Sequence, residues 1–130
     1  MYNQSNFHAA QAYRSASTAV PPLRAVIMMI DGAINFLNRS IKASEDGKFE
    51  ASHGHMIRAT TILRGLSHNL NFEKGGAVAE SLHTAYHALI MVCLRSYGRP
   101  DSAASYRRII AGLTEMRDAW IHVALQPKAG

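Results

Sequence analysis

The spacing of apolar residues between Leu23 and Ile41 is the feature that most limits how this chain can fold. Apolar side chains recur at steps of three and four residues, at Val26, Ile27, Ile30, Ile34, Leu37 and Ile41. This period places them on one side of a helix. The pattern therefore predicts a helix that begins at Leu23 and continues to Asp46-Gly47.

Three further segments show the same period. They predict helices over roughly Lys48–Leu70, from Ala77 to about Tyr97, and from Asp101 or Ser102 to Val123. The stretches "NFEKGG" (71–76) and "GRPD" (98–101) separate them, since paired glycines or a proline interrupt a helix. No segment alternates apolar and polar residues as a strand would. Short connections make neighbouring helices antiparallel, so the predicted fold is all-α, an up-down four-helix bundle.

The bundle is expected to span residues 21–125. Residues 1–20 are mostly small and polar, and they predict either a short helix around Phe7–Ser15 or a mobile arm. Pro21-Pro22 closes this segment and pre-sets the first turn of the next helix. Residues 126–130 are expected to form a C-terminal tail.

Composition excludes several classes of protein. Hydrophobic residues make up 48% and charged residues 18% of the 130 residues, which is typical of a globular domain. The N-terminus lacks the apolar core of a secretory signal, and the longest apolar run, Ala88–Leu94, is too short to span a bilayer. A single cysteine excludes a disulfide framework. We therefore expect a soluble protein of the cytoplasm without a membrane span.

The net charge of +5 raises the alternative of a regulatory or nucleic-acid-binding bundle. Its basic residues are scattered, however, and Arg107-Arg108 is their only adjacent pair. A nucleic-acid-binding face usually clusters its Lys and Arg. We expect no nucleic-acid partner, and the salt dependence of binding separates the two readings.

Candidate chemistry is sparse. His83 and His87 lie one helical turn apart with Glu80 before them, but a metal site needs three or four ligands in fixed geometry. Cys93 lies within an apolar run and resembles a buried hydrophobe rather than a nucleophile. Phosphate-binding glycine motifs do not occur. The sequence predicts no catalytic site, no metal and no cofactor.

The chain carries more apolar side chains than a four-helix core requires. The surplus consists of Met28, Met29, Ile30, Ile90, Met91 and Leu94. Such a surface either binds a partner, for which methionine is well suited, or lies beneath a short N-terminal helix of the same chain.

Four stretches together resemble one family. They are "QAYRSASTAVPP" (11–22), "MIDGAINFLN" (29–38), "NFEKGGAVAESLHTAY" (71–86) and "LTEMRDAW" (113–120). In this order and spacing they are similar to the flagellar secretion chaperone family FliS, over nearly all of residues 8–121. The positions that match the family are Tyr13, Pro22, Asp31, Gly32, Ala33, Phe36, Leu37, Asn71, Phe72, Glu73, Gly75, Gly76, Leu82, Tyr86 and Trp120.

The resemblance implies a cytoplasmic chaperone that binds the disordered C-terminal segment of flagellin. It would prevent premature polymerisation and deliver flagellin to the flagellar type III export apparatus. Whether a co-chaperone or an anti-sigma factor also binds is left open. The expected partner-binding residues are Tyr13, Met28, Met29, Ile30, Ile34, Leu37, Tyr86, Leu89, Ile90, Met91 and Leu94.

Two local roles are also expected. The arm that carries Tyr13 would cover the binding groove in the absence of flagellin, and removal of residues 1–18 would test this. Glu73 would cap the amide groups at the start of the third helix.

Overall fold

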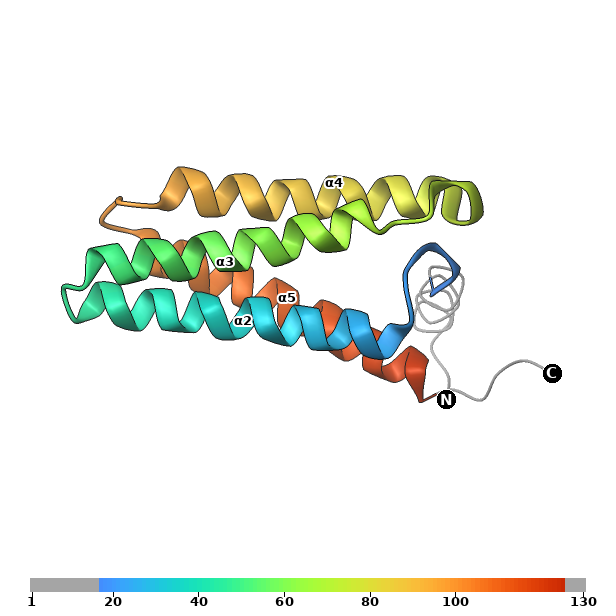
Figure 1. Cartoon of the computed structure of the whole chain (residues 1–130), viewed down its shortest axis with the longest axis horizontal. Helices are drawn as coiled ribbons and strands as arrows, with labels where there is room; N and C mark the ends of the chain where they lie inside the picture. The colour runs from blue at the N-terminus through green and yellow to red at the C-terminus, as the bar shows by residue number, and fades with distance from the viewer. Residues whose placement is uncertain (1–16, 126–130) are drawn as a thin grey trace, which may run out of the picture.

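A computed structural model describes residues 17–125 of the chain, and Figure 1 shows their arrangement. Within this range there are four long helices, one short 3-10 turn and no strand. The elements are η1 (Ser17–Ala19), α2 (Leu23–Glu45), α3 (Phe49–His68), α4 (Phe72–Ser96) and α5 (Ser102–Ala124).

The helices form an up-down bundle, as the apolar period predicts. Successive helices run in opposite directions, α2 contacts α3 and α5, and α4 contacts the same two helices from the other side. The two hairpin turns at Gly47 and Gly98 have positive φ, 75° and 78°, and end α2 and α4. The predicted first helix is confirmed, and its end differs from the prediction only by a residue or two.

The core follows the predicted apolar stripes. Its largest fully buried side chains are Trp120, Tyr86, Tyr106, Ile30, Leu37, Met56, Leu63, Leu113, Val26, Thr60, Cys93 and Ser40. Burial of this apolar surface is the main stabilising contribution to the bundle.

A reciprocal pair of serines joins α2 to α3 near their shared turn. Ser40 Oγ donates to the Ser52 carbonyl and Ser52 Oγ donates to the Ser40 carbonyl, both at 2.8 Å. The two hydroxyl oxygens lie 3.0 Å apart. Because both side chains are buried, these bonds satisfy polar groups that would otherwise be costly and fix the register of the hairpin.

The junction between α3 and α4 contains an extra helical turn that the sequence did not reveal. Phe72 begins α4, whereas the prediction placed the start of the helix at Ala77. Gly76 has φ 49° and ψ −124°, which interrupts the helix within α4. This backbone conformation strongly favours glycine. The long straight part therefore begins at Ala77, as predicted, and Phe72–Gly75 is a separate turn before it.

The cap of this turn is Asn71. Its Oδ1 accepts a hydrogen bond from the backbone N–H of Lys74 at 2.9 Å. Glu73, expected as the capping residue, lies within the first turn itself, and no side-chain hydrogen bond of Glu73 contributes to the cap described for α4. Asparagine suits this position because its short side chain reaches back to an unpaired amide group.

Gly75 serves a different purpose from Gly76. A Cβ atom at Gly75 would overlap Ala19 Cβ and lie 3.1 Å from Ala19 Cα. The N–H of Asn71 also donates to the Ala19 carbonyl at 2.8 Å. Thus η1 packs directly against the start of α4, and only a residue without a side chain fits between them.

Candidate functional site

The outer surface of α4 is unusually apolar. Within four consecutive positions it exposes Met91 (41%), Val92 (40%) and Leu94 (38%). Two neighbours face the core instead: Ile90 directly precedes this stretch, and Cys93 lies within it. The helix is therefore apolar on both sides, as the sequence predicts for its second half, although it lies at the edge of the bundle (Figure 1).

By length and composition α4 also meets the criterion for a helix that could cross a membrane. One such helix is weak evidence, because core helices of soluble proteins meet the same criterion. Here only 22% of the most apolar stretch is buried within the bundle. Part of its apolar surface, at Met91, Val92 and Leu94, is thus available for contacts outside the bundle.

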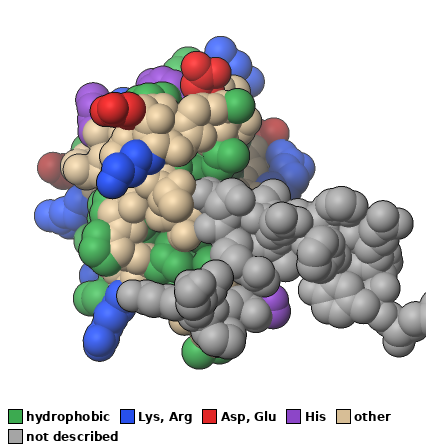
Figure 2. Space-filling model, turned by 90° about the vertical axis from the view of Figure 1, so that its right-hand side faces the viewer, with side chains coloured by type: hydrophobic (Ala, Val, Ile, Leu, Met, Phe, Trp, Pro, Cys, Tyr) green, Lys and Arg blue, Asp and Glu red, His purple; other side chains and the backbone are tan. Residues whose placement is uncertain are grey.

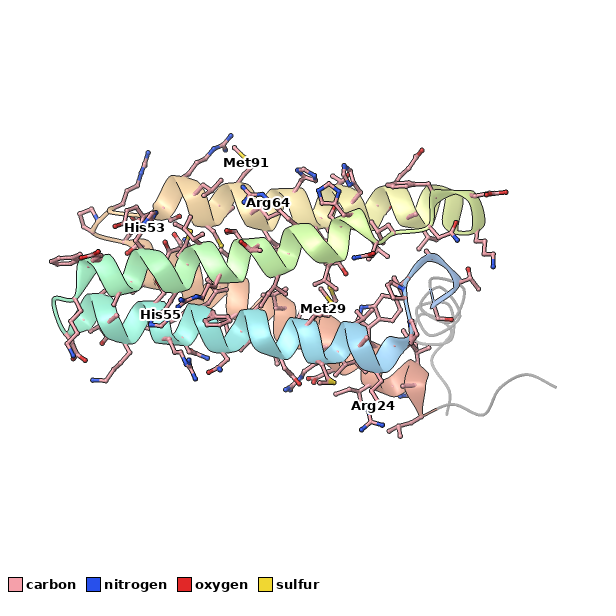
Figure 3. The ribbon with its side chains drawn as sticks, viewed as in Figure 1. Arg24, Met29, His53, His55, Arg64 and Met91 are labelled. Carbon is pink, nitrogen blue, oxygen red and sulfur yellow. The ribbon has the colours of Figure 1, made fainter. Side chains whose placement is uncertain are left out.

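Two contacts fix how α3 lies against α4. The rings of His53 and Tyr97 have centroids 4.7 Å apart, and Ser67 Oγ lies 2.7 Å from His83 Nδ1. Both pairs fit one antiparallel register, with His53 and Ser67 on α3 opposite Tyr97 and His83 on α4. In Figure 3, His53 and Arg64 lie along the α3–α4 seam and Met91 on the outer side of α4.

This register brings exposed apolar residues of both helices together. Ile57 follows His53 by one turn, and Leu94 precedes Tyr97 by one turn, so they flank the same seam. Ile57 is 38% exposed and Tyr97 39%. We call Ile57, Met91, Leu94 and Tyr97 the apolar α3–α4 face.

Near the other end of the same seam is a small pocket. Arg64, Ser67, His68, Phe72, His83 and His87 line it. The His83 ring contacts Phe72 edge-on at 5.8 Å and lies 4.3 Å from the His87 ring. Phe72 is itself 47% exposed, which extends the apolar character of the seam toward the junction.

The expected partner-binding residues divide into three groups. Met28, Met91 and Leu94 are exposed, and Met29, Ile34 and Leu89 are half-buried. Ile30, Leu37, Tyr86 and Ile90 lie in the core instead, each at most 3% exposed. Tyr13 lies outside the described residues.

The placement of the four core residues corrects the sequence analysis. They fall on the inward line of α2 or α4, where the neighbouring helices cover them completely. Apolar residues on all sides of a helix do not reveal which side faces inward. The surplus surface is therefore smaller than the sequence indicates, and in α4 it centres on Met91.

Met29 is also largely used within the bundle. A Cβ atom at Gly65 of α3 would lie 3.4 Å from Met29 Cε, and one at Gly32 would lie 3.4 Å from Ile62 Cδ1. The two glycines thus allow long apolar side chains to fill the space between α2 and α3 (Figure 3).

Most of the remaining family-motif residues contribute to the core or to the start of a helix. Ala33 and Trp120 are fully buried, and Leu82 packs part-buried against the core. Pro22 immediately precedes α2, and its carbonyl accepts the N–H of Ala25 at 2.9 Å. Asp31 is exposed and forms an ion pair described below.

Neither Cys93 nor the His83–His87 pair has the surroundings of a nucleophile or a metal site. Burial raises the pKa of the Cys93 thiol to about 11, so it stays protonated and is a poor nucleophile. Among residues 17–125, no group of three or more His, Cys, Asp and Glu side chains is arranged to hold a metal ion. His83 accordingly contacts Ser67, Phe72 and His87.

Comparison with known proteins identifies the family. The family model described as flagellar protein FliS matches residues 4–127.

This chain belongs to the FliS family.

A similar relative is the flagellar secretion chaperone FliS of Salmonella typhimurium, strain LT2. The two sequences are 30% identical, and the match covers 99% of this chain and 96% of the relative. The FliS family is non-enzymatic. Membership supports a role as a flagellar secretion chaperone.

Three members of the exposed apolar surface, Ile57, Val92 and Tyr97, were missed by sequence reasoning in this FliS-family chain. Ile57 directly follows the buried Met56, and Val92 directly precedes the buried Cys93. The signal in the sequence was an apolar residue beside, rather than on, the core-facing line. This signal identifies exposed apolar residues only when it is already known which side of the helix faces the core.

Proposed function

We propose that this chain is a cytoplasmic chaperone that binds the disordered C-terminal segment of flagellin. In this role it would prevent premature filament assembly and deliver flagellin to the flagellar type III export apparatus. Family membership supports the general role. The apolar α3–α4 face is the observation that carries the proposal of a segment-binding mode.

The chemistry of this face suits an amphipathic helix. Ile57 and Leu94 present branched apolar side chains beside the seam between two antiparallel helices, and Met91 adds a flexible one on the outer side of α4. An amphipathic helix places residues three and four apart in such a seam. Methionine adapts its shape to different side chains, which helps a surface accept a client that is unfolded when free.

The area involved must be large. A segment that folds on binding loses conformational entropy, which costs about 2–5 kcal/mol of the gross interaction energy. The α3–α4 face is therefore proposed as one part of a longer contact that also includes the exposed Met28 on α2. Phe72 lines the pocket at the junction end of the α3–α4 seam and adds an exposed apolar side chain there.

The test is a titration of the full chain with a peptide of the flagellin C-terminal segment. Met91→Gln and Leu94→Gln, combined, should weaken binding on the order of tenfold, since each removes apolar contact worth about 1 kcal/mol. The heat capacity change of binding should be negative and should shrink in the variant.

A matched control is Ile121→Gln. Ile121 is an exposed apolar residue of α5, 36% exposed, and it is outside the α3–α4 face. Its affinity for the peptide should match that of the unmodified chain. Equal weakening by both variants, or full affinity in the Met91/Leu94 variant, would contradict the proposed binding face.

We also propose that the N-terminal arm with Tyr13 covers this surface until flagellin binds. Ser17–Ala19 is attached to the start of α4 by the Asn71–Ala19 hydrogen bond, which holds the beginning of the arm near the α3–α4 junction. Deletion of residues 1–16 keeps this attachment and removes only the arm. It should raise the association rate of the flagellin peptide, and an unchanged rate and affinity would refute the gating role.

A further inference from the structure

A second surface, on the α2–α3 hairpin, gathers basic residues that are scattered in the sequence. Two adjoining hollows share Lys48, Ala51 and His55. Arg39 and Lys42 of α2 line the first hollow, and Arg58 of α3 lines the second. We call Arg39, Lys42, Lys48, His55 and Arg58 the basic hairpin face.

Phe36 organises the centre of this face. The guanidinium carbons of Arg39 and Arg58 lie 5.7 Å and 5.9 Å from the centre of its ring. Cation–π attraction at such distances favours these positions over free rotation. Arg39 on α2 and Arg58 on α3 are nineteen positions apart in sequence, yet both place their guanidinium groups beside the Phe36 ring.

These charges are only partly neutralised within the chain. Lys42 pairs with Asp46 at 3.1 Å. Arg39, Lys48 and Arg58 have no carboxylate within ion-pair distance among residues 17–125. Their N–H groups remain available to an external acceptor, and Arg in particular presents a planar fork that matches a carboxylate.

His55 adds a polar group at the point where the two hollows meet. Its ring stacks on Phe36, with centroids 6.1 Å apart and planes 25° apart. His55 Nδ1 is buried without a hydrogen-bond partner.

We propose that the basic hairpin face binds an acidic segment of a second protein, separately from the flagellin-binding surface. Discrete guanidinium and ammonium groups match the separate carboxylates of Asp and Glu side chains. The exposed Phe49, which lines the second hollow, offers contact to an apolar residue of the same segment.

Nucleic acid fits this surface less well. The Phe36 ring is half-buried and already contacted by two guanidinium groups, so it is not free to stack on a base. Figure 2 shows the opposite end of the bundle, near the α3–α4 junction, where Lys and Arg side chains are spread among acidic and apolar ones.

The proposal is tested by fluorescence anisotropy with a labelled Asp- and Glu-rich peptide and, in parallel, a labelled single-stranded oligonucleotide. The full chain should bind the peptide, more weakly as ionic strength rises. The double variant Arg39→Gln/Arg58→Gln should lose affinity for the peptide on the order of tenfold. Arg39→Lys/Arg58→Lys should be intermediate, because it keeps the charge and loses the fork.

The control is Arg24→Gln/Lys74→Gln, which changes the net charge equally at exposed positions. Arg24 lies in the first turn of α2 and Lys74 in the first turn of α4, at the end of the bundle opposite the Gly47 turn (Figure 3 labels Arg24). This control should retain peptide affinity. Equal losses in both double variants would show attraction by net charge alone and overturn the proposal. Binding of the oligonucleotide but not the peptide, or of neither, would also overturn it.

The flagellin peptide serves as a second readout. Arg39→Gln/Arg58→Gln should bind it as the unmodified chain does, because neither side chain belongs to the apolar α3–α4 face. Loss of flagellin binding together with acidic-peptide binding would overturn the separation of the two surfaces. Loss of the acidic peptide alone would support it, whatever the outcome for flagellin in other variants.

Discussion

Arg117 Nη1 on α5 lies 3.2 Å from Asp31 Oδ1 on α2, and its Nη2 lies 3.0 Å from Asp118 Oδ1. Two of the stretches that resemble the FliS family, "MIDGAINFLN" and "LTEMRDAW", are therefore joined by an ion pair across the bundle. Hydrogen bonds with Asp118 and with Asp31 raise the pKa of Arg117. Sequence alone offered no partner for Asp31, because the two residues are 86 positions apart.

Asp31→Asn tests what this ion pair contributes. The side chains are 33% and 49% exposed, so water and salt screen the attraction. We expect a small fall in the melting temperature at low ionic strength that disappears at high ionic strength. A large, salt-independent fall would show that Asp31 has a buried structural role instead.

Gly75→Ala should destabilise the junction. The new methyl group would overlap Ala19, and overpacking of this kind costs about 1–3 kcal/mol. Gly112→Ala on α5 is the control, since nothing lies within 4 Å of a Cβ there and alanine favours a helix by about 1 kcal/mol. Urea denaturation should thus give opposite signs for the two variants, and Ala19→Gly should partly restore the stability of Gly75→Ala.

Tyr86→Phe should leave stability unchanged or raise it. The Tyr86 hydroxyl is buried without a hydrogen-bond partner, and an unpaired buried polar group costs about 1–3 kcal/mol. Tyr106→Phe is the comparison, because the Tyr106 hydroxyl donates to the Cys93 carbonyl at 3.4 Å. Thermal denaturation of both variants measures the difference. A clear loss of stability in Tyr86→Phe would show that its hydroxyl has a partner.

Stability should fall in alkaline solution. Burial raises the pKa of Cys93 from 9.0 to about 11 and that of Tyr86 from 10.0 to about 12. The unfolded chain thus loses these protons at a lower pH than the folded chain, so rising pH favours unfolding. The contribution is complete below about pH 9 and is lost progressively up to about pH 12.

Urea denaturation at a series of pH values checks this dependence. The variant Cys93→Ala/Tyr86→Phe should show a shallower decline, whatever its stability at neutral pH. An equally steep decline in the variant would assign the effect to other groups, of which Tyr106 is one because burial also raises its pKa, to about 12.

The helices were predictable because their signal is local. Apolar spacing located α2 and α5 closely, and paired glycines located the break before Ala77. The turn Phe72–Gly75 was not predictable, since it depends on Ala19 packing against Gly75 from fifty-six positions away. Its cap, Asn71, was part of the quoted motif, but Glu73 was expected to cap the helix instead.

The site was less predictable than the fold. Met91 and Leu94 were named correctly as exposed, whereas Ile90 was not, because the sequence of α4 is apolar on every side and does not indicate which side faces inward. The basic hairpin face was missed for a related reason. Arg39 and Arg58 appear scattered along the chain, and only the antiparallel pairing of α2 with α3 brings them to one ring.

The position of Gly76 has a mechanical consequence. It divides α4 into a short first turn, Phe72–Gly75, which is held to Ser17–Ala19, and a long second part, Ala77–Ser96, which carries Met91 and Leu94. Rotation about this single residue would move Phe72–Gly75 and the attached Ser17–Ala19 together, while the rest of α4 stays packed beside α3. Rotation at Gly76 would thus let the start of the chain move without displacing the helix that carries the proposed binding residues.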